Sequence, residues 1–168
     1  MVRRIARSRS NDLTRGSLLI EAVVAAAIAL IVLTGVIGTF SYLLRASASN
    51  KQNVQAAFLE EEGLEAARIL RDGGWTANIA SHTSGTPFYL VFATSTWAAT
   101  STDTFVDGVF ERKVTLADVY RDSNKNIVAN GGTLDPAIKL VTVSVSWLSR
   151  GATTTHTLST YLANVFNN

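Results

Sequence analysis

The most informative part of this chain is residues 15–44, which read RGSLLIEAVVAAAIALIVLTGVIGTFSYLL. From Ala22 to Leu44 there are 23 consecutive residues without a charged side chain. A helix of that length rises roughly 35 Å at 1.5 Å per residue, which is enough to cross the hydrocarbon core of a bilayer. Residues 17–44 are therefore expected to form a membrane-spanning helix.

Charge is distributed unevenly around this segment. Residues 1–16 hold five arginines and one acid, Asp12, which gives them a net charge of +4, whereas the whole chain has +2 and residues 17–168 therefore −2. By the positive-inside rule, the basic end is expected in the cytoplasm and the C-terminal part is expected to be exported. Because the remaining Lys and Arg are scattered singly among acids, the sequence shows no face for binding nucleic acid.

Two common kinds of N-terminal segment leave features of this one unexplained. A cleaved secretory signal has an apolar region of about 7–15 residues and a small-residue cleavage site after it, but this run is longer and lacks such an exit. A plain signal anchor stays open as an alternative. Neither accounts for Gly16 directly before the apolar run, nor for Glu21 just inside it.

Glu21 needs a physical reason to be where it is. An ionised carboxylate inside a membrane span costs about 2–3 kcal/mol or more unless it is paired, so such residues are usually functional. Pairing with a buried cation would be strong at low dielectric, and a misplaced neighbour would leave both charges unpaired. Glu21 is therefore expected to set the register between packed helices. The alternative is that its side chain merely reaches the headgroups from near the helix end.

The segment Arg15–Glu21, followed by a helix of Ala, Val, Ile and Leu, resembles the processing site of type IV prepilins and type II secretion pseudopilins. The resemblance implies that residues 1–16 are a cytoplasmic leader peptide, which a prepilin peptidase removes by cutting after Gly16. Ser17 would then be the new, N-methylated terminus, although the family usually has Phe or Met there. Glu21 matches the acid at the fifth position of the mature chain, where it would pair with the terminal amine of a neighbouring subunit.

Two glycines, Gly35 and Gly38, interrupt the apolar helix. Each weakens a helix by about 1 kcal/mol relative to Ala. One interpretation is close packing against other helices, for which small residues are favoured. The other is a stretch that unwinds on assembly, because major pilins often carry a Pro where this chain has Gly38. The sequence leaves both open.

The helical pattern continues beyond the membrane segment, because no Pro occurs before Pro87. Small and apolar residues recur at spacings of three and four and so share one narrow stripe. These residues are Ala56, Leu59, Gly63, Ala66 and Leu70. Gly73 and Gly74 then end the helix. The sequence predicts one helix from about Leu18 to Arg71, of which residues 45–72 form an amphipathic half that packs on a sheet.

The acidic run Glu60–Glu62 is expected to be a solvated face of this helix. Glu65 and Arg68 are placed to form an ion pair at i, i+3.

Residues 73–168 have the composition of an antiparallel β head. Apolar and polar residues alternate strictly from Lys139 to Trp147, and a turn at residues 149–151 leads to a returning strand from Ala152 to Leu162. Phe105 to Tyr120 is expected to form another strand or pair of strands, and Pro87 to Ala93 a short one. The fold class is therefore α+β, with one long N-terminal helix packed on an antiparallel sheet, as in type IV pilins.

Together with its N-terminus, most of the chain resembles minor pilins of the PilV kind. The likeness lies in residues 58–72, 110–114, 120–122, 141–147 and 158–162. It implies a minor type IV pilin that assembles into a pilus through its N-terminal helix. The implied partners are prepilin peptidase, other pilins or pseudopilins, the inner-membrane assembly platform and the lipid bilayer.

Two other functions stay open at the level of the sequence. One is a pseudopilin of a type II secretion or DNA-uptake system, and the other is a single-pass, membrane-anchored binding module that does not polymerise. A pilin or pseudopilin would begin in the inner membrane with its head exported. It would end in a pilus on the cell surface or in a pseudopilus in the periplasm.

Residues suited to catalysis or to metal binding are sparse. The chain has no cysteine, and neither His82 nor His156 has a His or Cys at a spacing typical of a metal site. The nucleophile motif Gly-x-Ser-x-Gly is also absent. We therefore expect no catalytic residues, no cofactor and no enzyme activity.

One segment partly matches a calcium-binding loop. Asp122, Asn124 and Asn126 have the spacing of the first ligands of an EF-hand, but Ile127 replaces the required Gly and Thr133 the required Glu. A hairpin turn is expected instead, because Asp and Asn are ordinary turn residues.

Overall fold

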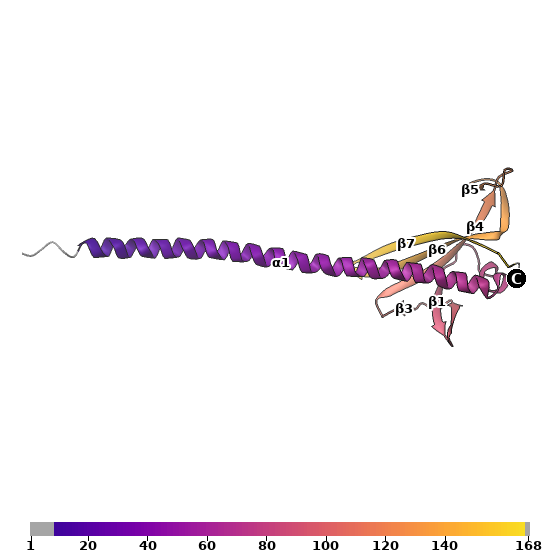
Figure 1. Cartoon of the computed structure of the whole chain (residues 1–168), viewed down its shortest axis with the longest axis horizontal. Coiled ribbons are helices and arrows are strands. Elements are labelled where there is room, and N and C mark those ends of the chain that lie inside the picture. The colour runs from indigo at the N-terminus through magenta and orange to yellow at the C-terminus, as the bar shows by residue number, and fades with distance from the viewer. Residues whose placement is uncertain (1–8, 167–168) are drawn as a thin grey trace, which may run out of the picture. The chain divides into compact units, whose positions relative to one another are not determined.

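The computed structural model describes the backbone of residues 9–166 and the side chains of residues 17–166. It contains a long helix, α1 (Arg9–Asp72), and a short π-helix, η1 (Thr76–Ala80). The strands are β1 (Phe88–Ala93), β2 (Thr96–Thr100), β3 (Phe105–Val106), β4 (Phe110–Arg121), β5 (Ile127–Val128), β6 (Thr133–Ser149) and β7 (Ala152–Ala163) (Figure 1). The chain divides into two units, residues 1–49 and 50–168, which are described separately.

The described part of the first unit is helical throughout. From Ser17 onward, α1 is long enough and apolar enough to cross a membrane, and the side chains of its most apolar stretch are exposed to their surroundings. The helix begins at Arg9, earlier than the expected start near Leu18. A single glycine such as Gly16 weakens a helix without ending it, and no proline intervenes. The expected leader, residues 1–16, lies partly outside the described residues, since residues 1–8 are not described.

In the second unit, residues 50–72 of α1 pack on the sheet through the expected stripe. All five of its predicted members, Ala56, Leu59, Gly63, Ala66 and Leu70, are buried. Leu64 and Ala67 are also buried, so the contact face is wider than predicted. Gly63 marks the closest approach, because a Cβ added there would lie 2.8 Å from Cγ1 of Val143.

Replacing Gly63 by Ala is expected to destabilise the head. Alanine improves helix propensity by about 1 kcal/mol, but its Cβ collides with a buried, β-branched side chain, and such overpacking costs about 1–3 kcal/mol. A lower thermal midpoint of the purified chain would show that the collision outweighs the gain. Gly35→Ala is the matched control, because nothing lies within 4 Å of its Cβ position. A Gly63→Ala midpoint at or above that of Gly35→Ala would contradict the close approach.

The sheet of the head is antiparallel, with the strand order β2-β1-β4-β6-β7 and with β3 and β5 paired to β4. The predicted alternation from Lys139 to Trp147 is confirmed within β6, and the predicted returning strand is β7. Phe105 to Tyr120 is the predicted pair of strands, β3 and β4. The sequence did not predict β2, β5 or η1.

The core lies between α1 and one face of the sheet. Every second residue points into it from Phe110 to Leu116 in β4 and from Val141 to Trp147 in β6, and Val114, Leu116, Val141, Val143 and Val145 are fully buried. An irregularity between Asp118 and Val119 shifts this alternation by one residue, which buries Val119.

Candidate functional site

The expected processing site lies on the N-terminal part of α1. The backbone of Gly16 is helical, and Ser17 and Glu21 are exposed on the same helix. They are four residues apart, so they lie one turn apart on one face. Among the described residues, Glu21 makes no hydrogen bond or ion pair with another side chain. The carboxylate is therefore available to a group beyond the described residues, and a carboxylate in an apolar segment needs such a partner.

The glycines of the apolar segment do not interrupt the helix. α1 continues through Gly35 and Gly38, and nothing lies within 4 Å of a Cβ added at either residue. The hydroxyl of Thr39 donates to the carbonyl of Gly35 at 3.0 Å, and Thr34 donates to Leu30 at 2.9 Å. Hydroxyls satisfied on their own helix suit a lipid environment. The space beside the glycines admits another helix, and unwinding there stays a prediction.

A buried arginine lies between α1 and the sheet of the head. Arg112 of β4 is only 4% exposed, and its Nη1 atom donates to Oε2 of Glu62 on α1 at 2.6 Å. Its guanidinium carbon lies 5.1 Å from the centre of the Trp97 ring, a cation–π distance. Arg112 occupies an inward position of the β4 alternation, between Phe110 and Val114. The burial of Arg112 could therefore have been predicted from the alternation of residues in this strand.

The burial of Glu60 contradicts the prediction that residues 60–62 form a solvated face. The residue is only 7% exposed, and its Oε1 atom has no hydrogen-bond partner among the described residues. Burial raises the pKa of Glu60 above its ordinary value, and the nearby His156 of β7 lowers that pKa to a smaller extent. The imidazole of His156 lies edge-on to Trp147, with 5.0 Å between ring centres. Glu61 and Glu62 are exposed as predicted, and the predicted pair of Glu65 and Arg68 is confirmed at 2.9 Å.

Replacing Glu60 by Gln is expected to stabilise the head at neutral pH. An acid whose pKa is raised by folding stabilises the fold while it is protonated, and that contribution is lost as pH rises from the unfolded pKa through the folded one. Gln keeps the shape but removes the buried charge, so the free energy of unfolding should rise by about 1 kcal/mol at pH 7. At pH 4, wild type and variant should differ little. Glu61→Gln, an exposed control, should change stability little at either pH. Lower stability of Glu60→Gln at pH 7 would contradict an unfavourable buried charge.

The partial match to a calcium loop is a hairpin turn, as predicted. Oδ1 of Asp122 accepts hydrogen bonds from the backbone N–H groups of Asn124 at 2.9 Å and Asn126 at 2.8 Å. These bonds, with those from Asn126 foremost, lower the pKa of the Asp122 carboxyl. Within residues 17–166, no group of three or more His, Asp or Glu side chains is arranged to hold a metal ion.

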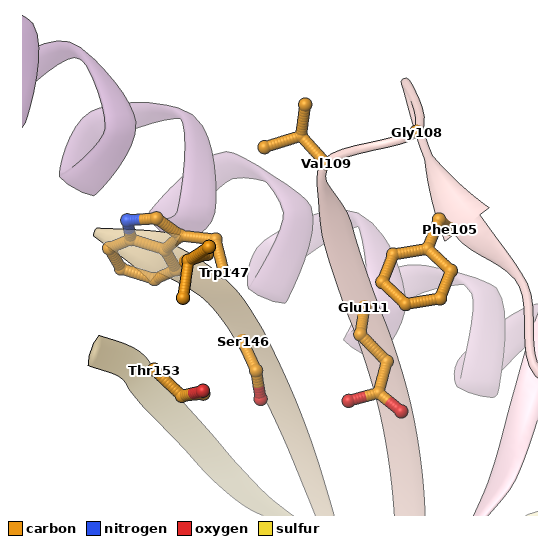
Figure 2. Close-up of a pocket in the computed structure, with 8 residues that line it drawn as sticks. Phe105, Gly108, Val109, Glu111, Ser146, Trp147 and Thr153 are labelled. Carbon is orange, nitrogen blue, oxygen red and sulfur yellow. The ribbon is translucent and has the colours of Figure 1, made fainter. Parts of the chain in front are cut away.

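An open recess lies at one end of the sheet (Figure 2). It has a volume of about 470 Å³, and its lining includes Phe105, Val109 and Trp147 together with Ser146 and Thr153, which carry hydroxyls. Glu111 is the one ionisable side chain in its lining, and the ammonium of Lys113 lies 2.6 Å from its carboxylate.

Comparisons of the chain with protein-family models, with curated proteins and with solved structures found no match.

Proposed function

We propose that the chain is a minor subunit of a type IV pilus, which is processed after Gly16 and packs its N-terminal helix into the filament. The observation that carries this proposal is the exposed apolar helix with a carboxylate inside it. Residues 18–44 present apolar side chains all round, and Glu21 interrupts them one turn after Ser17. A helix of that kind is buried in a membrane or among other helices.

In the proposed assembly, the basic residues, the apolar helix, Ser17 and Glu21 each have a distinct role. The basic residues before Gly16 keep that end cytoplasmic, where the peptidase acts, and the apolar helix holds the chain in the bilayer. Cleavage creates a free amine at Ser17. In the filament, this amine pairs with Glu21 of a neighbouring subunit, so that both charges are neutralised only in the correct register.

The head has features expected of a subunit that presents a stable exported surface. Residues 50–72 of α1 close one face of the sheet, and the opposite face carries many Ser and Thr hydroxyls, such as Thr142 and Ser159, which hydrogen-bond to each other at 2.8 Å. A hydroxyl-rich face is readily solvated, so the head needs no covering on that side.

Mechanical shearing of cells that express the chain and a prepilin peptidase tests this function. We expect the mature chain in the pellet of sheared filaments, together with other pilins. A Gly16→Val variant, in which the residue before the cut is bulky, is the control and should remain uncut in the membrane fraction. Processed wild-type chain found only in membranes would instead support an anchored module that does not polymerise. Its recovery from filaments that never leave the periplasm would support a pseudopilin.

A further inference from the structure

One edge of the sheet in the head lacks a neighbouring strand. β7 is the last strand in the order β2-β1-β4-β6-β7 (yellow in Figure 1). It pairs with β6 over twelve residue pairs, from Ser149 with Ala152 to Ile138 with Ala163, without a shift in register. Within residues 9–166, no strand pairs with its other side.

The outward-facing backbone groups of β7 follow from its pairing. Opposite residues of an antiparallel pair alternate between hydrogen-bonded and non-hydrogen-bonded positions. The N–H of Asn164 bonds to the carbonyl of Ala137, in continuation of the same register, so the even-numbered residues of β7 face β6. The odd-numbered residues therefore direct their N–H and C=O groups away from the sheet. Between residues 153 and 161 they are Thr153, Thr155, Thr157, Ser159 and Tyr161, and all five side chains are exposed.

The edge has none of the usual features that prevent a further strand from pairing. Natural edge strands are typically short, charged, interrupted by Pro or twisted away by bulges. β7 is 12 residues long, is free of Lys, Arg, Asp, Glu and Pro, and has no bulge. An edge of this kind is a template for strand addition.

The flank of α1 beside β7 indicates which strand would fit. An open groove of about 520 Å³ is lined by Leu158 of β7 and by Phe58, Glu61 and Leu64 of α1, among others. Phe58 is 66% exposed. Glu62 and Glu65 in the same lining are paired with Arg112 and Arg68, whereas Glu61 has no ion pair within the described residues. The groove therefore favours apolar side chains together with a cation.

We propose that the β7 edge binds an extended segment of a partner protein, with hydroxyl-bearing side chains on the outer face and apolar and basic side chains toward α1. Its backbone would pair with the outward groups of residues 153–161. Its apolar side chains would cover Phe58 and Leu158, and a Lys or Arg would pair with Glu61.

A second copy of the chain fits the edge less well. Antiparallel pairing of β7 with β7 of another copy would make their helical segments 50–72 run in opposite directions. Subunits anchored in one membrane share one orientation. Parallel pairing of the two edges would bring no Lys or Arg to Glu61, since β7 has neither.

Binding of a synthetic peptide tests the proposal. The probe is a fluorescein-labelled peptide, TVTKTVTKT, and the target is the full chain in phosphatidylcholine nanodiscs, with empty nanodiscs as the blank. We expect saturable binding by fluorescence anisotropy. Thr157→Pro removes one outward N–H without breaking the ladder to β6 and should weaken binding at least tenfold. Thr157→Val keeps that N–H and should bind like wild type. Thr155→Pro serves as a second variant if Thr157→Pro lowers the thermal midpoint by more than a few degrees.

A probe with reversed charge tests whether the peptide's side chains contribute to binding through Glu61, in addition to the backbone hydrogen bonds. The peptide TVTETVTET should bind wild type at least fivefold more weakly, and this difference should disappear in Glu61→Gln. Equal binding of TVTKTVTKT by wild type and both proline variants, or no saturable binding to wild type, would overturn the proposal. Self-association of the wild type that Thr157→Pro abolishes would identify a second copy as the occupant and would equally overturn it.

Discussion

A chain in which Glu21 is replaced by Ala is expected to be cut after Gly16 and inserted in the membrane normally, yet to be nearly absent from filaments. The proposed filament pairs the carboxylate of Glu21 with the amine of a neighbour's Ser17. Removing one member of a buried ion pair costs about 3–5 kcal/mol, because the other charge is left without a partner. Since each 1.4 kcal/mol is a factor of ten, incorporation should fall at least a hundredfold. The measurement is the ratio of mature chain in sheared filaments to mature chain in membranes.

Two further substitutions show whether charge or shape is responsible. Glu21→Gln keeps the size of the side chain and loses the charge, so it should fail like Ala. Glu21→Asp keeps the charge on a shorter side chain and should restore part of the incorporation. If Glu21→Gln entered filaments like wild type, the carboxylate would have no partner in the filament, as expected if it only reaches the lipid headgroups.

The second large effect is expected in the head, where Glu62→Gln should lower the free energy of unfolding by about 3 kcal/mol. The reason is the asymmetry of the ion pair, because the side chain of Arg112 is 4% exposed and that of Glu62 is 47% exposed. Loss of the carboxylate leaves a buried guanidinium without a counter-charge, and its Nε atom already lacks a hydrogen-bond partner among the described residues. Denaturant unfolding of the purified chain measures the change.

Replacement of the other member of the ion pair, Arg112, provides the matched control. Arg112→Met removes the buried charge, keeps a long apolar side chain beside Trp97, and leaves Glu62 able to contact water. It should therefore cost less than Glu62→Gln, although both substitutions remove the same ion pair. The double variant should resemble Arg112→Met alone, because Glu62 has no buried charge to neutralise in that background. If Arg112→Met were the more damaging change, packing of the arginine stem rather than its charge would dominate.

The elements whose apolar residues recur at a regular spacing along the chain were predictable from the sequence. The stripe from Ala56 to Leu70 and the alternation in β6 are periodic patterns, and the structure confirms both. Strand β2 was not predicted because the turn before it, Thr94 and Ser95, has positive φ at both residues, 51° and 65°, without the Asn or Gly that usually indicate such a turn.

The polar cluster of the head was missed for a different reason. Glu60 belongs to a run of three acids, and such runs are usually solvated. Its burial depends on its position beside the stripe, four residues after Ala56 and four before Leu64, and on the sheet that covers this face. Arg112 could have been recognised from the period-2 pattern of β4, which places it between two inward-facing apolar residues. The processing site at Gly16 and Ser17 was inferred from a local motif and stays a prediction, as does pairing between subunits, which would involve residues of two chains.

Determination of the mature N-terminus tests the central proposal most directly. The full chain is produced with and without a prepilin peptidase, and intact-mass and N-terminal peptide mass spectrometry are applied to the purified membrane protein. The proposed function predicts a chain beginning at Ser17, with or without an added methyl group, only when the peptidase is present. An uncut chain in the presence of the peptidase, or one cut beyond residue 38, would contradict it.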